Sequence, residues 1–196
     1  MTGNKQSGFT LIEMLVAVTL FAIAGTVLSI TVVSFGRFHR KIAHASVLNG
    51  EMRAIGDILT RRSRLMHLTF PVGDFSTKIS SFQMTSKDPS VGGFEQLRLG
   101  SGVECADSTV TNCLVVDVTN GLGATTTHVI TGTRINVTRF DIYPRPLSSP
   151  FAAIANPPTT QPMMTVRIGL QYVAPDPREN VTLDAQTSYV FRDYQK

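Results

Sequence analysis

The hydrophobic pattern of the chain changes character twice, and each change indicates a different kind of structure. Residues 9–35 are apolar almost without interruption, with Glu13 as their single charge. A helix needs about 20 such residues to cross the hydrocarbon layer of a membrane. No proline precedes Pro71, so nothing obliges this helix to break. The pattern predicts a transmembrane helix over residues 9–35.

From residue 36 to 68 the apolar positions recur every three or four residues, which is the spacing of one helix face. The spacing predicts that a single helix runs from Phe9 to about His67, where Pro71 and Gly73 end it. Residues 36–68 would be its amphipathic continuation. That part would dock on a sheet through an apolar stripe made of Phe35, Phe38, Ile42, Ala45, Leu48, Met52, Ile55 and Leu59.

Beyond residue 69 the pattern changes to short β-prone runs between Gly, Pro, Ser and Asp. Two of them alternate polar and apolar positions, as half-buried antiparallel strands do. A long helix followed by strands predicts an α+β fold, with an antiparallel β-sheet head over residues 69–196 packed on the helix. The candidate strands are Ile79–Thr85, Phe94–Leu99, Leu114–Thr119, His128–Ile130, Ile135–Tyr143, Met164–Val173 and Val181–Tyr194.

Charge is scarce and unevenly placed. Charged residues make up 16 % of the chain and hydrophobic residues 42 %, which excludes a mostly disordered protein. Residues 1–68 hold eight Lys/Arg and three Asp/Glu, a net +5, whereas residues 69–196 hold ten and eleven, a net −1. The basicity belongs to the helix, so a nucleic-acid-binding head is not favoured.

Two other interpretations of the apolar run are possible. One is a buried core helix, although an all-round apolar run of this length is rare in a small domain. The other is a removable secretory signal, with Lys5 as its basic region and a cut after Ala24, which would yield a soluble exported protein. Glu13 argues against the second, because it places a carboxylate inside a region that should be purely apolar.

The N-terminus resembles a specific family. Residues 5–13, with the sequence KQSGFTLIE, form a short basic leader that ends in Gly8, followed by Phe9 and, four residues on, Glu13 before the apolar helix. This pattern is similar to the prepilin-type signal of type IV pilins and type II secretion pseudopilins. The size of the chain resembles that of a larger minor subunit in this family.

The resemblance implies a function and its residues. A prepilin peptidase would remove the leader, residues 1–8, by cutting between Gly8 and Phe9, and would methylate the new amine of Phe9. Glu13 would pair with the Phe9 amine of a neighbouring subunit during filament assembly. Phe9 and Glu13 of one chain are also four residues apart, on the same helix face. The sequence therefore leaves open whether Glu13 pairs with the amine of its own chain or with that of a neighbour. The head would face the periplasm from a single-pass anchor in the inner membrane.

The resemblance therefore identifies the chain as a minor pilin or minor pseudopilin, a structural subunit of a type IV pilus or a type II secretion pseudopilus. Its partners would be other pilin subunits through their N-terminal helices, the prepilin peptidase and the inner membrane. A competence pseudopilin that binds DNA is the alternative.

The cations around the apolar run bear on its orientation in the membrane. Three follow it (Arg37, Arg40 and Lys41), and only Lys5 precedes it. A plain count of cations therefore favours an orientation opposite to the one that the resemblance implies.

Cys105 and Cys113 are eight residues apart, without the CxxC spacing of a zinc or redox site. In an exported head a disulfide is the natural prediction, and two buried free thiols are the alternative.

The segment 144–162 contains six of the ten prolines and fits no regular element. It would form an exposed insertion that contacts a neighbouring subunit or a mobile flap.

No enzymatic motif is recognisable: the chain has no GxSxG, no HExxH and no phosphate-binding glycine loop. Metals and cofactors are not expected either, because the four histidines are scattered and His39 and His44 do not have the i,i+4 spacing of a metal pair. Arg61, Arg62 and Arg64 are interpreted as part of a solvated helix face.

Overall fold

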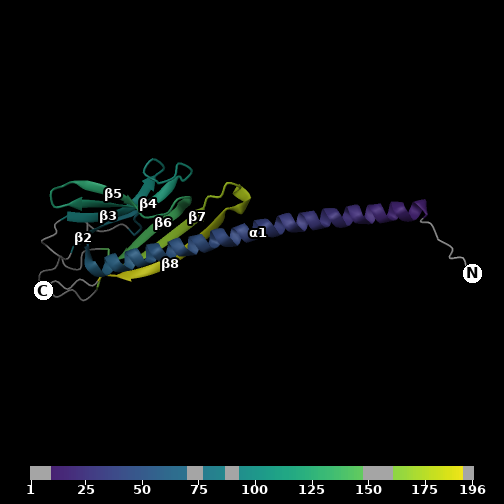
Figure 1. Cartoon of the computed structure of the whole chain (residues 1–196). Helices are drawn as coiled ribbons and strands as arrows, with labels where there is room; N and C mark the ends of the chain where they lie inside the picture. Colours follow the sequence, from purple (N-terminus) through teal and green to yellow (C-terminus); the bar gives the residue numbers. More distant parts are fainter. Residues whose placement is uncertain (1–9, 70–76, 87–92, 148–160, 192–196) are drawn as a thin grey trace, which may run out of the picture. The chain divides into compact units, whose positions relative to one another are not determined.

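The computed structural model describes residues 10–69, 77–86, 93–147 and 161–191. It confirms the α+β fold, with one long helix followed by antiparallel strands (Figure 1). The chain divides into two compact units, Met1–Ile42 and Ala43–Lys196. The elements are α1 (Leu11–Leu65), β1 (Met66–Leu68), β2 (Ser81–Ser86), β3 (Gly93–Ser101), β4 (Asn112–Asn120), β5 (Thr125–Val129), β6 (Ile135–Arg145), β7 (Met163–Tyr172), the 3-10 turn η1 (Pro177–Glu179) and β8 (Val181–Val190).

Helix α1 is unbroken over 55 residues. It ends two residues before His67, because the chain turns directly into β1, which pairs with β2 through Met66↔Ser86 and Leu68↔Met84. The predicted end near His67 was therefore slightly wrong. The side chain of Leu68 is buried in the core, which favours the strand position of this residue.

The head contains two antiparallel sheets instead of the single sheet expected. The larger has the order β1-β2-β3-β4-β5 and the smaller the order β6-β7-β8. A hydrogen bond from the backbone N–H of Asn112 to the side-chain oxygen of Asn136 (2.9 Å) joins β4 to β6. Every strand of the larger sheet pairs with its neighbour in sequence, which allows short connections.

One common core joins both sheets to the later turns of α1. Leu48, Ile55 and Leu59 of the helix pack in one cluster with residues of β2, β3, β4, β6, β7 and β8. The turns around Met52 and Gly56 face Val166 and Ile168 of β7. The later turns of α1 run beside β8 in Figure 1.

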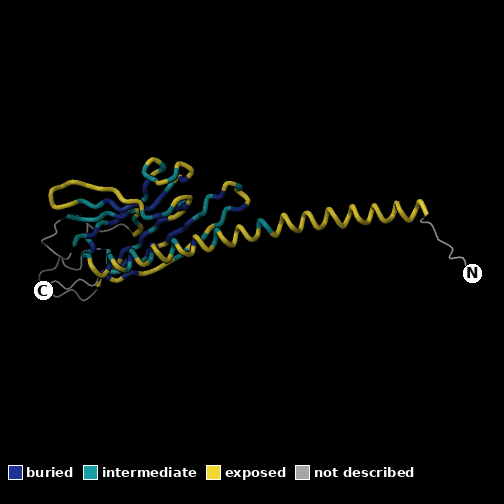
Figure 2. The backbone as a smooth tube through the Cα atoms, in the orientation of Figure 1, coloured by how far each residue is buried: buried dark blue, intermediate teal, exposed yellow. Residues whose placement is uncertain are grey.

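The docking stripe is shorter than the spacing predicts. Phe35, Phe38 and Ile42 are exposed, although Gly36 and Arg37 between them are intermediate, and the apolar stripe itself is first partly covered at Ala45 (Figure 2). His44 marks this point: its ring stacks on Tyr172 with the centroids 4.1 Å apart. Helical periodicity identified the apolar face correctly, but periodicity carries no information on where the covering sheet ends.

The seven predicted strands are all present, with ends that differ by a few residues. The largest difference is in the last, where β8 stops at Val190 and residues 192–194 lie outside the described residues. The proline-rich segment begins later than expected, because Pro144 and Arg145 still pair with β7 as part of β6. Residues 148–160 of that segment lie outside the described residues, so its role stays a prediction.

Candidate membrane and assembly site

Thr10 caps the N-terminus of α1. Its carbonyl oxygen accepts hydrogen bonds from the backbone N–H groups of Glu13 (3.1 Å) and Met14 (3.2 Å), and its hydroxyl accepts a longer bond from Glu13 N (3.4 Å). Glu13 is then the third helical residue, which is the position where a capping box carries glutamate. The spacing Thr10-x-x-Glu13 is the sequence signal for this cap, and the sequence analysis missed it.

The carboxylate of Glu13 lies in the first turn of the helix and is exposed. The positive end of the helix dipole favours an anion there. Among the described residues, none forms an ion pair with this carboxylate. Gly8 and Phe9, the predicted cleavage and methylation positions, lie outside the described residues, so the pairing of Glu13 with an amine stays a prediction.

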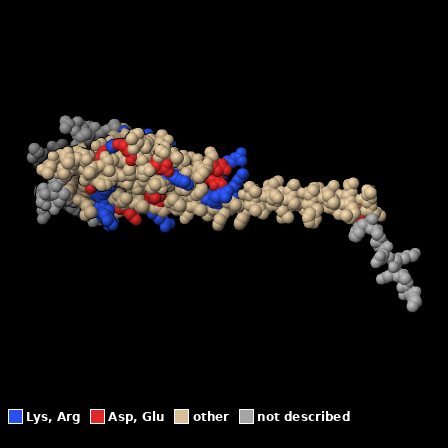
Figure 3. Space-filling model, turned by 45° about the horizontal axis from the view of Figure 1, so that its top comes forward, with Lys and Arg blue, Asp and Glu red and all other residues tan. Residues whose placement is uncertain are grey.

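The apolar part of α1 is uncovered by the rest of the protein. Residues 10–35 are all exposed, and none of the most apolar stretch of the helix is buried (Figure 2). Figure 3 shows the same stretch, on the face in view, as a surface without charged side chains beyond its first turn. A core helix of a soluble domain would be mostly buried, so that interpretation is wrong. Within the described residues, α1 is the one helix long and apolar enough to cross a membrane.

Four hydroxyl groups of this stretch are satisfied within the helix. The hydroxyls of Thr19 and Thr26 donate to carbonyls three residues earlier (2.9 and 2.8 Å). Those of Ser29 and Thr31 donate to carbonyls four residues earlier (2.9 and 2.8 Å). A hydroxyl without a partner is costly in hydrocarbon, and these local bonds remove that cost. The sequence therefore suits a lipid environment in its polar as well as its apolar positions.

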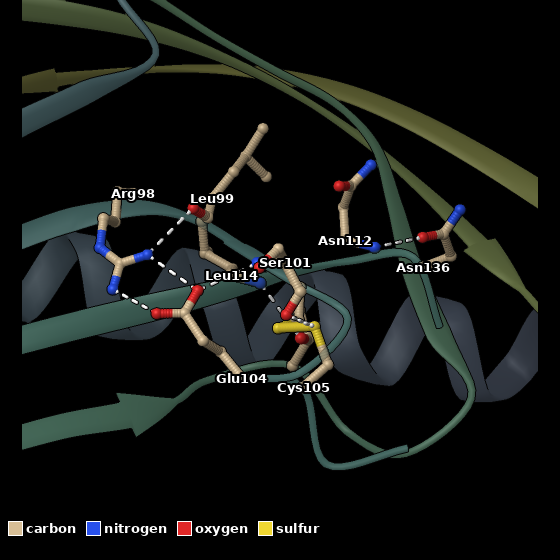
Figure 4. Close-up of a disulfide and its surroundings, with 10 residues drawn as sticks. Arg98, Leu99, Ser101, Glu104, Cys105, Asn112, Leu114 and Asn136 are labelled. Atoms are coloured by element: carbon tan, nitrogen blue, oxygen red, sulfur yellow. Dashed lines mark hydrogen bonds and ion pairs between the residues drawn. A yellow bond between two sulfur atoms is a disulfide. The ribbon is translucent and has the colours of Figure 1, made fainter. Parts of the chain in front are cut away.

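The predicted disulfide is confirmed. Cys105 and Cys113 are bonded, with their Cα atoms 5.6 Å apart. The bond ties the loop between β3 and β4 to the outer face of the larger sheet, beside Arg98 and Glu104 (Figure 4). Gly100 permits this close approach, because a Cβ atom there would lie 3.2 Å from the Cys113 sulfur and 2.8 Å from Val115.

A cluster of three charged residues holds the same loop. The guanidinium of Arg98 donates to Asp117 (Nε–Oδ2, 2.6 Å) and to Glu104 (Nη2–Oε1, 2.7 Å). The hydrogen bond from Arg98, followed by one from Ser101 N, lowers the pKa of Glu104 to about 2. Hydrogen bonding from Arg98 lowers the pKa of Asp117 as well, and burial opposes it. Sequence reasoning missed this cluster, since its members are 6 and 19 residues apart without a recognisable pattern.

The remaining candidate residues have structural contacts. Arg62 forms an ion pair with Glu95 (2.7 Å), so the run at residues 61–64 is only partly a solvated face. His39 stacks on Phe35 within α1, and His67 lies in β1 instead of on the helix. No group of three His, Cys, Asp or Glu that could hold a metal is present in the described part of the chain.

The comparisons with known proteins bear on the N-terminus. Residues 3–29 match the family model described as the prokaryotic N-terminal methylation motif. No match was found among curated proteins or among solved structures. The matched residues include Thr10, Glu13 and the beginning of the exposed apolar stretch. The chain thus carries the prepilin-type signal that is typical of type IV pilins and pseudopilins, followed by a long N-terminal helix and a β-sheet head, which is the pilin-like arrangement.

Proposed function

We propose that the chain is a minor pilin or minor pseudopilin. The prepilin peptidase cuts between Gly8 and Phe9 and methylates Phe9, and the exposed helix then holds the subunit in the inner membrane with its head in the periplasm. During assembly the helix enters the core of a filament, where apolar packing replaces lipid and Glu13 meets the positively charged amine of Phe9. Its partners are other pilin subunits, and members of this family are generally structural and not enzymatic.

One observation carries this proposal: the matched methylation motif is continuous with a helical stretch that the protein itself leaves entirely uncovered. A stretch of this kind requires another apolar environment, because exposing so many large side chains to water is unfavourable. Lipid provides that environment before assembly, and the helices of other subunits provide it afterwards. A minor subunit is favoured by size, since removing residues 1–8 leaves 188 residues.

The DNA-binding alternative receives no support from the head. Three of its cations are paired: Arg62 with Glu95, Lys78 with Asp141, and Arg98 with both Asp117 and Glu104. DNA binding relies on basic residues that are available to phosphates. These cations are instead neutralised by neighbouring carboxylates.

The mature N-terminus tests the proposal. The chain is co-expressed with a prepilin peptidase, and its N-terminal peptide is analysed by mass spectrometry. We expect N-methyl-Phe9. A chain that begins at Gly25 would support a secretory signal cut after Ala24 instead, and a membrane-bound chain that retains Met1 would contradict processing.

Glu13→Ala tests the assembly step. This variant should still insert in the membrane, because an apolar residue replaces a charge, but its incorporation into sheared filaments should be lost. Asp57→Ala is the matched control, since it removes an exposed carboxylate from the later turns of the same helix. Normal incorporation of the Glu13→Ala subunit would contradict the proposed role of this carboxylate.

A further inference from the structure

The segment Phe35–Ile42 of α1 follows the uncharged stretch and precedes the turns that pack in the core. We call it the collar. Its apolar side chains Phe35, Phe38 and Ile42 are three and four residues apart, hence on one face, and they are 71 %, 62 % and 51 % exposed. At about 100° per residue, Arg37 points about 130° away from the centre of that face, and Lys41 about 90° away, at its border. The collar is thus amphipathic, with a basic face, and its apolar face is uncovered.

Arg37 and Lys41 have no acidic neighbours on their own helix turns. No Asp or Glu occurs between Glu13 and Glu51. Arg37 and Lys41 stand at i and i+4, where like charges repel and weaken a helix. This arrangement is unfavourable unless anions from outside the helix offset the repulsion. The exposed apolar side chains beside them suit anions that lie next to a hydrophobic phase.

The length of the helix places the collar at a membrane surface. From Glu13 to Arg37 the helix rises about 36 Å, and from Glu13 to Lys41 about 42 Å. The hydrocarbon layer is about 30 Å thick, and the bilayer with its headgroups is about 40–45 Å thick. If the first turn of α1 lies at one boundary of the hydrocarbon, Arg37 lies among the headgroups of the opposite leaflet, and Lys41 lies just beyond them.

The direction of the side chains brings both cations closer to the lipid. In an α-helix each Cα–Cβ bond tilts toward the N-terminus, which for the collar is the direction of the bilayer. Long Arg and Lys side chains can therefore reach back to phosphate groups while their methylene groups cover apolar surface. On the other face Phe35 stacks on His39 with the centroids 6.5 Å apart, giving an aromatic pair at the same level.

We propose that the collar binds anionic phospholipid headgroups through Arg37 and Lys41. It is a lipid-binding site that fixes the depth of the subunit in the bilayer before the subunit enters a filament. The inference rests on the proposed membrane anchoring. It also gives a role to cations that otherwise oppose the expected orientation, because headgroup phosphates retain them on whichever side the collar emerges.

The test uses the full chain reconstituted in phosphatidylcholine vesicles that contain about one-fifth phosphatidylglycerol. Electron spin resonance compares the association of spin-labelled phosphatidylglycerol and spin-labelled phosphatidylcholine with the protein. The natural chain should select the anionic lipid, by up to about fivefold for each cation. The selectivity should be lost in Arg37→Gln/Lys41→Gln, and it should fall when salt is added.

Arg53→Gln/Arg61→Gln is the matched control. It removes two cations that are exposed in the later turns of the same helix, and it should keep the selectivity. Equal selectivity for anionic lipid in the natural chain and in the collar variant would overturn the inference. Flotation of the vesicles separates the two proposals: protein that fails to float contradicts membrane anchoring itself, whereas protein that floats without selecting anionic lipid contradicts only the collar.

Discussion

The apolar stretch of α1 and the head differ in where their side chains find partners. In the stretch, large side chains such as Phe21 contact little of the protein, and the hydroxyls bond to the backbone of their own helix. In the head, Leu48 and Ile55 of the same helix are buried against two sheets, and charged groups are paired across strands. The two parts of α1 therefore have the same helical backbone but differ in what surrounds their side chains.

This difference teaches that the two regions depend on different conditions. The stability of the head is internal, since its core, disulfide and ion pairs are all supplied by the chain. Under the proposed function, the apolar stretch gains its stability from lipid or from other subunits. Substitutions in the apolar stretch should therefore leave the stability of the head unchanged, and substitutions in the head should leave membrane insertion unchanged.

Replacing a core residue of the helix should destabilise the head, and replacing an equally apolar exposed residue should not. Ile55 is 1 % exposed and Phe21 is 84 % exposed. Ile55→Ala should lower the free energy of unfolding of the head by about 2–5 kcal/mol, and Phe21→Ala should leave it unchanged. All four tyrosines lie between residues 143 and 194 and the chain has no tryptophan, so tyrosine fluorescence during urea unfolding in detergent measures the head alone. Equal effects of the two substitutions would contradict the division.

Removing the disulfide should lower the free energy of unfolding of the head without affecting membrane insertion of the apolar stretch. Cys105→Ala/Cys113→Ala opens a loop with a sequence separation of 8, and the loss should be about 2.5 kcal/mol by loop entropy. Urea unfolding gives this value, and the membrane fraction of cells gives insertion. If the double variant does not accumulate, reduction of the purified natural protein gives the same comparison. An unchanged urea midpoint on reduction would show that the bond does not stabilise the loop.

The Arg98 cluster should make the head sensitive to acid. The pKa of Glu104 is lowered from 4.5 to about 2 in the folded protein, and that of Asp117 is also lowered. Because the folded pKa is the lower one, the stabilisation is fully present above pH 4.5 and is lost as the pH falls toward 2. Arg98→Met should flatten this part of the profile of unfolding free energy against pH. Arg167→Met is the control, since Arg167 contacts Gln186 and Tyr143 instead of a carboxylate.

The smallest effect is expected for the hydroxyls that bond within the helix. Thr26 donates to Ile23 in the apolar stretch (2.8 Å), and Thr60 donates to Gly56 in the head (2.7 Å). Valine has the same shape and a similar helix propensity, so either substitution should change stability by less than about 0.5 kcal/mol. Impaired insertion of Thr26→Val would mean that the hydroxyl contacts something other than its own helix.

The sequence was sufficient for the parts of the fold that depend on local patterns. Periodicity predicted the long helix and alternation predicted the strands. The disulfide was predicted because Cys105 and Cys113 lack the CxxC spacing of a metal or redox site and the head was expected to be exported. The sequence was also sufficient for Glu13 as a candidate, because a charge within an apolar run is conspicuous. Each of these signals lies within a few residues of the feature that it predicts.

The features that were missed depend on contacts between distant residues or on very short elements. The division into two sheets is fixed by which strands pair, and alternation within a strand does not specify its neighbour. Strand β1 has three residues and exists because Met66 and Leu68 pair with β2. The bond between Arg98 and Asp117 joins residues on adjacent strands, where only the register of β3 and β4 brings them together.

The cap at Thr10 has a consequence for the order of events at the N-terminus. The groups that close the first turn belong to residues 10–14, all on the mature side of the proposed cut. Excision of the leader therefore leaves these hydrogen bonds intact, and the rod need not refold when the peptidase acts. From Thr10 onward the helix would therefore be the same before and after the proposed cut, which would add a positive charge just ahead of it.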